Sequence, residues 1–483
     1  MAKESPNVLL ICTDHWPGLL TRPAGHREVI TPTLAQLAAN GVHYSNAYST
    51  CPSCIPARRS LMTGLTERTH GDRIFDQHRL MPPVPTMAQC FRDSGYHAFA
   101  VGKLHVYPQR DRIGFDEVIL NEEGRHHLGM SGDDWEQYLA EHGHVGLEHA
   151  GGLCSNDYNV RTWHLPDRFH QTEWSAREMC RAIHRRDPQR PGFWYLSFAG
   201  PHPPVWPLQA YMDLYRDIDI APPVIGEWAR DQAALPYALR AYSDGGPSLR
   251  GAPAHEVELA RRAFYATMTH IDHQIRVVIG CLREEGLIDN TIVAFTSDHG
   301  DMLGDHGRWA KTLMYEMSAK IPLIIMPAKE DERLEIGSVD DRLTTLYDVM
   351  PTLLDMAGID VPTTVEGSSL LSSAKRSSLY GEHWEGDHAT RMVRDQRHKL
   401  IYYPVGNHLQ LFDLAQDPRE ECNLANSPDH ASVVEQLETE LVNRFYGDDL
   451  AWVKDGELVG EHDRESVPPR HRDLAGQRGI RFM

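Results

Sequence analysis

The run Asn7-Val-Leu-Leu-Ile-Cys-Thr13 is mostly apolar and ends directly in Asp14-His15. An apolar run of this length with polar residues at its carboxyl end is typical of a buried strand in a parallel sheet. Comparable runs recur along the chain, and we expect each of them to form a strand: Val42–Tyr48, His97–Lys103, Phe193–Phe198, Thr291–Thr296 and Ile321–Met326.

Segments with helical patterns separate these strands. Thr31 and Pro32 are typical of a helix start, and Gly41 of a helix end. Further helices are expected over Arg59–Leu65, Thr86–Arg92, Glu256–Glu285 and Thr344–Met356. The alternation predicts an α/β fold with a large, doubly wound, mostly parallel sheet flanked by helices. Residues 107–185 and 205–255 break the alternation, and we expect loop-rich insertions there.

The pattern changes from about Ser377 onward. Short strands are expected at Leu379–His383, Arg391–Arg394, His398–Tyr403 and Leu409–Leu414, followed by a helix over Ala431–Phe445. This predicts a smaller C-terminal α+β domain (residues 376–483) with a four-stranded antiparallel sheet, beside a catalytic domain formed by residues 1–375. The Arg-rich tail Arg470–Arg481 is compatible with packing in a homo-oligomer and equally with a free tail.

Composition excludes several classes of protein. The 483 residues include 48 Lys+Arg and 68 Asp+Glu, a net charge of −20 that argues against a nucleic-acid or anionic-membrane partner. The apolar runs fall short of the roughly 18 residues that a membrane span needs, and the first run has no basic leader. Eight cysteines are too sparse for a disulfide scaffold, so we expect a cytoplasmic protein.

Polar clusters follow several of the predicted strands. Asp14-His15 and Asp298-His299 each follow one, and Lys103 ends another. Because the carboxyl ends of parallel strands meet at one edge of a sheet, two Asp and two His from separate strands predict a divalent-metal site there. Oxygen-rich ligation favours Ca²⁺ or Mg²⁺, whereas two imidazoles favour Mn²⁺ or Zn²⁺. The 28 histidines agree with metal or proton chemistry.

A more specific signal is the segment from Cys54 to Gly64, which matches the pattern C-x-P-x-R-x4-T-G. With this segment, the chain resembles the type I sulfatases of the alkaline phosphatase superfamily. The resemblance extends over residues 7–425 and includes several further blocks in the family's order: Gly102-Lys103-Leu-His105, Pro201-His202-Pro203-Pro204, Ser297-Asp298-His299-Gly300, Gly304-Asp305-His306-Gly307, Lys311 and the C-terminal Leu409–Leu424.

The resemblance implies that Cys54 is converted to Cα-formylglycine by a formylglycine-generating enzyme. Its hydrate would attack the sulfur of a small-molecule sulfate ester and expel the alcohol, and its second hydroxyl would then drive release of sulfate. The implied metal ligands are the converted Cys54 together with the two Asp-His pairs, Asp14, His15, Asp298 and His299. By this resemblance the ion is one divalent metal, Ca²⁺ first, with Mn²⁺ and Zn²⁺ as alternatives.

The same resemblance implies roles for five further side chains. Arg58 would fix the hydrate and offset its negative charge. Lys103 and Lys311 would bind the sulfate oxygens. His105 would hydrogen-bond the hydrate, and His202 would protonate the leaving alkoxide. Lys103, Lys311 and His202 are therefore also the predicted substrate-binding residues.

The chain departs from the family pattern at two positions, one of which bears on the metal and the other on the reaction. The family commonly has Asp or Gln where this chain has His15, so an extra nitrogen in the site leaves the metal open. The Asp298-His299 pair also occurs in the related phosphonate monoester and phosphodiester hydrolases, which use the same formylglycine. Hydrolysis of a phosphonate monoester or phosphodiester is therefore the alternative function.

Two further alternatives belong to other classes. Cys51-Pro-Ser-Cys54 is a C-x-x-C sequence, as in thiol–disulfide proteins, but the chain is several times too long, and Pro56 and Arg58 have no purpose in a redox motif. A non-catalytic binding protein that keeps Cys54 unmodified is disfavoured because every predicted catalytic position carries a competent residue.

Overall fold

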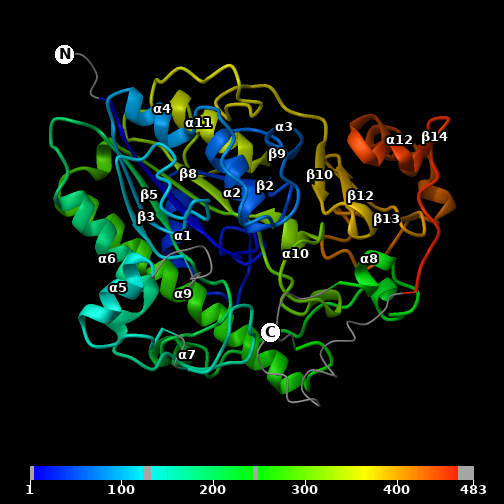
Figure 1. Cartoon of the computed structure of the whole chain (residues 1–483), viewed down its shortest axis with the longest axis horizontal. Helices are drawn as coiled ribbons and strands as arrows, with labels where there is room; N and C mark the ends of the chain where they lie inside the picture. The colour runs from blue at the N-terminus through cyan, green and yellow to red at the C-terminus, as the bar shows by residue number, and fades with distance from the viewer. Residues whose placement is uncertain (1–4, 123–131, 149–150, 243–248, 466–483) are drawn as a thin grey trace.

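The computed structural model describes residues 5–122, 132–148, 151–242 and 249–465 (Figure 1). Within these ranges the chain forms a nine-stranded sheet, a four-stranded sheet and a short two-stranded ribbon. The predicted tail at Arg470–Arg481 lies outside the described residues. In the part of the chain that is described, no helix is both long and apolar enough to span a membrane.

The large sheet confirms the predicted α/β fold. Its strand order is β4-β3-β5-β1-β6-β8-β2-β7, with β9 paired to β2. The bounds in chain order are β1 Asn7–Thr13, β2 Val42–Tyr48, β3 His97–Gly102, β4 Glu117–Leu120, β5 Gly192–Ser197, β6 Thr291–Ser297, β7 Lys320–Ile321, β8 Leu323–Met326 and β9 Ser338–Thr345. The central strand, β1, is parallel to both of its neighbours, β5 and β6. Only the pairs made by β7 and β8 are antiparallel.

Helices cover both faces of this sheet because side chains of the central strand alternate between two cores. Leu9 and Ile11 join the core beneath α1 (Pro32–Ala39), α6 (Gln171–His184) and α9 (Ala254–Glu284). Val8 and Leu10 join the core beneath α2 (Cys54–Thr63), α4 (Met87–Asp93) and α11 (Val349–Met356). The shorter helices are α3 (Glu67–His70), α5 (Asp134–Glu141), α7 (Gln209–Leu214), α8 (Tyr237–Arg240) and α10 (Glu316–Ala319).

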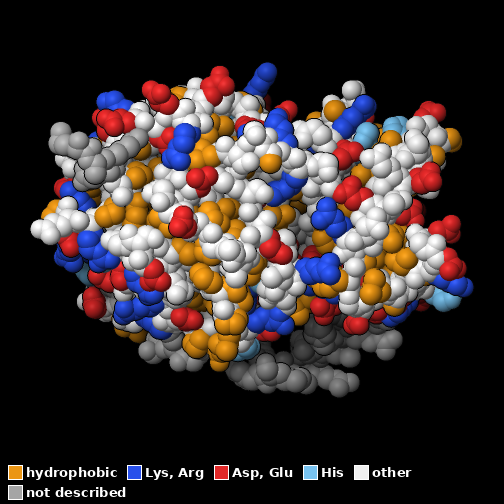
Figure 2. Space-filling model, turned by 90° about the horizontal axis from the view of Figure 1, so that it is seen from above, with side chains coloured by type: hydrophobic (Ala, Val, Ile, Leu, Met, Phe, Trp, Pro, Cys, Tyr) orange, Lys and Arg blue, Asp and Glu red, His pale blue; other side chains and the backbone are white. Residues whose placement is uncertain are grey.

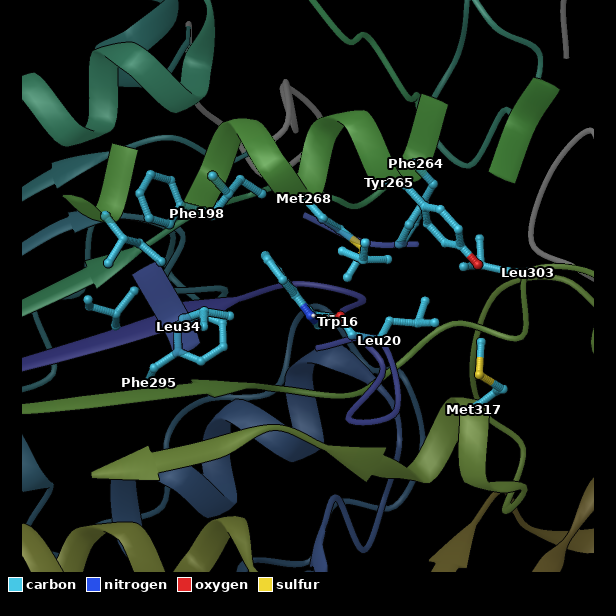
Figure 3. Packing of buried hydrophobic residues seen from close by; sticks show 14 of the residues in the cluster. Trp16, Leu20, Leu34, Phe198, Phe264, Tyr265, Met268, Phe295, Leu303 and Met317 are labelled. Carbon is cyan, nitrogen blue, oxygen red and sulfur yellow. Dashed lines mark hydrogen bonds between the residues drawn. The ribbon is translucent and has the colours of Figure 1, made fainter. Parts of the chain in front are cut away.

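The first of these cores packs directly against residues that follow the strand ends (Figure 3). Trp16, next to His15 in the sequence, is fully buried, and its ring centroid lies 5.4 Å from that of Phe295 on β6. Its indole N–H donates to the Leu20 carbonyl over 3.1 Å. The chain beyond the end of β1 is therefore fixed by apolar packing before any polar group is considered.

Three predicted elements are wrong in their extent. The helix predicted from Arg59 begins at Cys54 instead, because Pro56 lies in the first turn, where its missing N–H costs nothing. The helix predicted from Thr344 begins at Val349, and the preceding β-branched residues end β9. The strand predicted over Ile321–Met326 is divided at Pro322 into β7 and β8, since proline has no N–H for the ladder.

The predicted insertions also hold regular structure. Residues 107–185 contain β4, α5 and the 14-residue α6, and residues 205–255 contain α7 and α8. The sequence pattern missed α6 because the segment is short and lies between Pro166 and Pro188 in a loop-rich stretch. Its buried residues, including Trp174, Met179 and Ile183, pack on the sheet or on neighbouring loops.

The C-terminal sheet has four antiparallel strands, as predicted. They are β10 (Leu379–His383), β11 (Thr390–Arg394), β12 (His398–Tyr403) and β13 (His408–Asp413), and α12 (Ala431–Arg444) packs on one face. The two-stranded ribbon of β14 (Val453–Lys454) and β15 (Glu457–Leu458) follows. The other face of the sheet contributes Met392, Ile401, Tyr403 and Phe412 to the core of the large sheet. The boundary between residues 375 and 376 stays a prediction.

Figure 2 shows basic and acidic side chains intermixed over the face that it displays. Inside the molecule, by contrast, a buried cation joins the two sheets. The Lys399 ammonium on β12 is fully buried and donates to Glu316 on α10 over 2.6 Å and to Glu420 over 2.8 Å. It also donates to the Met314 carbonyl over 2.9 Å. These contacts hold the C-terminal sheet against the segment that follows Lys311.

We expect Lys399→Met to lower the free energy of unfolding by about 3–5 kcal/mol, because two buried carboxylates would lose their cation. The matched control is Lys329→Ala, which removes a 2.9 Å ion pair between exposed side chains and should cost at most about 1 kcal/mol. Denaturant unfolding of both variants measures the difference. Equal losses in the two variants would show that Lys399 does not join the sheets.

Candidate active site

The register of the parallel strands brings two aspartates side by side. Thr13 at the end of β1 pairs with Ser297 at the end of β6, so Asp14 and Asp298 leave the sheet at the same level. The Asp298 amide donates to the Thr13 carbonyl over 3.2 Å.

The neighbouring strand pair delivers Lys103 to the same edge. Gly102 pairs with Ser197, and its φ is +102°. A Cβ at Gly102 would lie 1.8 Å from the Ser197 carbonyl oxygen, so only glycine fits before Lys103. The Lys103 amide then donates to that same carbonyl over 3.0 Å.

Helix α2 contributes Cys54 and Arg58, which share one face because they are four residues apart. The buried Arg58 guanidinium forms a 2.8 Å ion pair from Nε to Asp298 Oδ2. Its Nη1 donates to Ser197 Oγ over 2.8 Å and to the Lys103 carbonyl over 2.9 Å. Arg58 therefore ties the start of α2 to the ends of β3, β5 and β6.

Four of the five predicted metal ligands form one cluster. Potential ligand atoms of Asp14, His15, Cys54 and His299 all lie within 4.8 Å of one another, and all four residues are buried. The Cys54 sulfur lies 3.4 Å from His299 Nε2 and 3.9 Å from Asp14 Oδ1. The fifth, Asp298, lies beside the cluster, with its Oδ1 3.6 Å from His299 Nε2 and its Oδ2 paired with Arg58.

The donor set of this cluster fits a divalent cation. It offers a carboxylate, two imidazoles and the side-chain position of Cys54, which are ligand types that such ions take in proteins. Burial by itself raises the pKa of Asp14, but nearby cationic groups, Lys103 foremost, outweigh it and hold that pKa well below its usual range. The carboxylate is therefore ionised, as a metal ligand must be.

The two predicted sulfate-binding lysines both contact members of this cluster. Lys103 Nζ contacts Asp14 Oδ2. Lys311 Nζ donates to the Cys54 sulfur over 2.6 Å and to His15 Nε2 over 2.8 Å. Burial lowers the pKa of Lys311, but Cys54 and Asp14 outweigh burial and raise it, so Lys311 stays charged.

A carboxylate not predicted from the sequence orients His15. Asp301 Oδ2 accepts a hydrogen bond from His15 Nδ1 over 2.7 Å, and both side chains are fully buried. The Tyr158 hydroxyl donates to the same oxygen, and the Leu303 amide donates to Asp301 Oδ1 over 2.9 Å. A carboxylate behind an imidazole is the usual support for a metal-binding histidine, since it fixes the tautomer and the ring orientation.

His105 is held with its ring available to a ligand. Its φ is +62°, and its amide and that of Leu104 both donate to Glu122 Oε1, over 2.8 and 2.7 Å. The ring is almost fully buried, and both ring nitrogens have no hydrogen-bond partner among the described residues. The backbone at His105 is therefore fixed while its imidazole can still bind a substrate atom.

His202 packs against His15, and the centroids of the two rings lie 4.4 Å apart. Its Nδ1 donates to the Pro203 carbonyl over 2.5 Å, so the neutral ring carries its lone pair on Nε2. Burial first, and then Lys311, lower the pKa of His202 well below its usual value. A proton-donating role therefore requires His202 to take up a proton when an anionic substrate binds.

The cysteine geometry argues against a thiol–disulfide centre. Burial, reinforced by Asp14, raises the pKa of the Cys54 thiol to about 11. Burial also raises the pKa of Cys51 well above its usual value, and both side chains are inaccessible. A redox C-x-x-C needs an accessible thiol of low pKa.

Taken together, a buried metal-type cluster that includes Cys54 lies one helical turn from Arg58, with Lys311 on Cys54, Lys103 on Asp14 and His202 packed against His15. This arrangement can bind a tetrahedral anion and transfer it to a nucleophile at position 54. Fold and site define a hydrolase that acts on a tetrahedral anion and whose cluster could hold a divalent cation.

The family is shown by comparison with known proteins. The Sulfatase family model matches residues 6–359, and the model described as N-sulphoglucosamine sulphohydrolase, C-terminal, matches residues 304–445. The chain belongs to the sulfatase family.

Individual relatives agree with this assignment. An arylsulfatase of Clostridium perfringens is 33% identical over 472 residues, covering 94% of this chain and 97% of the relative. A choline-sulfatase of Rhizobium meliloti is 28% identical over 451 residues, covering 89% and 84%. The phosphonate monoester hydrolase of Agrobacterium radiobacter has the same fold, with a TM-score of 0.79, 22% identity and coverage of 94% and 99%. The chain is an enzyme that hydrolyses sulfate esters.

We expect the thiol of unconverted Cys54 to resist alkylation by iodoacetamide at neutral pH in the folded protein, because it is buried and its pKa is about 11. The exposed Cys154 and Cys422 should be alkylated. Peptide mass spectrometry before and after denaturation measures all three sites. Rapid alkylation of Cys54 in the native protein would contradict this description of the site.

Proposed function

We propose that this sulfatase acts through a formylglycine at position 54 and one divalent metal held by Asp14, His15, His299 and, beside them, Asp298. One observation carries the proposal: the Cys54 side chain lies inside the cluster of metal-type ligands, at the start of a helix and one turn from Arg58. A nucleophile formed at this position would therefore lie against the metal that the cluster holds.

In this proposal a formylglycine hydrate supplies the nucleophilic oxygen, and the metal lowers its pKa. Arg58 sits on the same helix face and adds positive charge next to position 54. Lys103 contacts Asp14 and Lys311 contacts Cys54, and in this proposal both lysines bind the sulfate oxygens and offset the charge that develops during transfer. His105 hydrogen-bonds the group at position 54 through a ring nitrogen that has no partner among the described residues.

His202 donates the proton to the leaving alkoxide in this proposal. Its Nδ1–H is committed to the Pro203 carbonyl, so the proton that it gives is the one carried on Nε2. The bound sulfate ester favours protonation of Nε2 because it brings negative charge next to the imidazole.

The donor atoms of the cluster also indicate which metal ion it prefers. The sequence prediction placed Ca²⁺ first, yet the cluster contains two imidazoles and a single carboxylate, with Asp298 engaged by Arg58. This nitrogen content favours Mn²⁺ or Zn²⁺ over Ca²⁺. Elemental analysis of the purified protein identifies the ion.

We further propose maturation by a formylglycine-generating enzyme and a cytoplasmic location. The location is supported by the sparse cysteines, all eight of which are free. Cell fractionation of the native host tests the location, and the mass of the Cys54 peptide with and without the maturation enzyme tests the conversion.

The second candidate function is hydrolysis of a phosphonate monoester or phosphodiester. It is favoured by the position of His299 next to Asp298 in the cluster. The two functions share the nucleophile and the metal, and they differ only in the group that Lys103, Lys311 and His202 bind.

We expect kcat/KM for an aryl sulfate to exceed that for an aryl phosphonate monoester with the same phenol by at least about tenfold. The Cys54 peptide of the active enzyme should have the mass of an aldehyde. Cys54→Ala should lower kcat by about a thousandfold or more, whereas Cys51→Ala, the matched control, should keep the activity. A preference for the phosphonate, or an active enzyme with an intact thiol, would overturn the proposal.

We expect Asp301→Asn to weaken metal binding by about 10–100-fold, because it removes the carboxylate that orients His15. Tyr158→Phe should have a smaller effect, since it leaves the 2.7 Å contact between His15 and Asp301 in place. Bound metal after dialysis against graded chelator, and the melting temperature with and without chelator, measure this directly. Unchanged metal retention in Asp301→Asn would mean that His15 does not bind the ion.

A further inference from the structure

The end of β10 in the C-terminal sheet lies against the segment that leads to Cys54. The Glu382 amide donates to the Thr50 carbonyl over 2.8 Å. A Cβ added at Gly381 would lie 3.1 Å from the Thr50 carbonyl oxygen and 3.3 Å from Met314 Sδ. Thr50 shortly precedes Cys54 in the chain, and Met314 shortly follows Lys311. The smaller sheet thus contacts the segments that lead to Cys54 and away from Lys311.

Alternation along β10 directs His383 toward this edge. The Glu382 side chain points the opposite way, where it accepts hydrogen bonds from Arg73 and Tyr446 over 2.9 Å each. His383 therefore shares the face of Gly381, which looks toward Thr50 and Met314. The side chains that act electrostatically on its ring are Arg391, His299 and Lys311; His299 belongs to the metal-type cluster, and Lys311 contacts Cys54.

The imidazole of His383 is fully buried, and both of its nitrogens have no hydrogen-bond partner among the described residues. A buried polar group without a partner costs free energy that a ligand can recover. Two other described histidines share this property. One is His105, already in the site; the other is His270, whose ring packs 4.6 Å from that of Tyr211 and 4.8 Å from that of His170.

The chemistry of a neutral imidazole indicates what it can bind. Burial, followed by the charge of Arg391, lowers the pKa of His383 to about 3, so one ring nitrogen is a donor and the other an acceptor at neutral pH. Sulfate oxygens only accept, and they satisfy the N–H alone. The acceptor nitrogen needs a donor, which a hydroxyl group on the alcohol part of the substrate provides.

We propose that His383 is a substrate-binding residue that hydrogen-bonds a hydroxyl group next to the sulfate ester, so that the enzyme prefers sulfate esters of hydroxylated alcohols. The inference rests on the proposed function, since it places the ester between Lys103 and Lys311. The nucleophile and the charges then come from the large sheet, and selectivity for the alcohol comes partly from the small one.

The test compares phenyl sulfate with 2-hydroxyphenyl sulfate, which differ by one hydroxyl beside the ester. His383→Phe keeps a buried ring and removes both nitrogens. We expect it to lower kcat/KM for 2-hydroxyphenyl sulfate by about tenfold or more, mainly through KM, and that for phenyl sulfate by less than about threefold. His383→Gln, which keeps a donor and an acceptor, should recover part of the loss.

His270→Phe is the matched control, because it removes another pair of ring nitrogens that have no hydrogen-bond partner among the described residues. It should leave the ratio of kcat/KM for the two substrates unchanged. Equal losses on both substrates, or no loss on either, in a His383 variant with a native circular-dichroism spectrum would overturn the proposal. If the wild-type enzyme cleaves phosphonates and not sulfates, the proposed function fails. Phosphonate monoesters of the same two phenols then test His383 separately.

Discussion

The parallel register of β1 between β5 and β6 is the constraint on which the site depends. Because Thr13 is level with Ser297, the two aspartates leave the sheet together. The same edge receives Lys103 through the pairing of Gly102 with Ser197. A shift of one residue in either pairing would turn alternate side chains to the other face and separate these groups. The apolar packing that fixes the register is therefore also what positions the polar chemistry.

Buried charge makes the same arrangement rigid. Arg58, Asp14 and Lys103 are almost fully removed from solvent, and each faces an opposite charge nearby. Such groups are costly to bury singly and are stable only in one mutual geometry. Ionic contacts of this kind place a set of fixed dipoles and charges around position 54 before substrate arrives, which is the arrangement that favours transfer of an anionic group.

The sequence was sufficient for features that are local. Apolar runs identified β1 and β6, and the pattern from Cys54 to Gly64 identified the segment that brings Cys54 and Arg58 to the site. The start of α2 was missed because proline usually marks the outside of a helix, whereas Pro56 occupies its first turn. Asp301 was missed because its partner is distant in the chain; His15 and Asp301 are 286 residues apart. Only the folded sheet edge brings such residues together.

The burial of Cys54 has a consequence for the order of events in the cell. Its side chain is 1% exposed, and it is the first residue of α2, which packs in the core of the large sheet. An enzyme that modifies this side chain needs access to it, and the folded chain gives none. The proposed conversion would therefore compete with folding in time, and a chain that folds first would keep its thiol. The yield of active protein would then be set by the relative rates of these two processes, independently of how stable the final structure is.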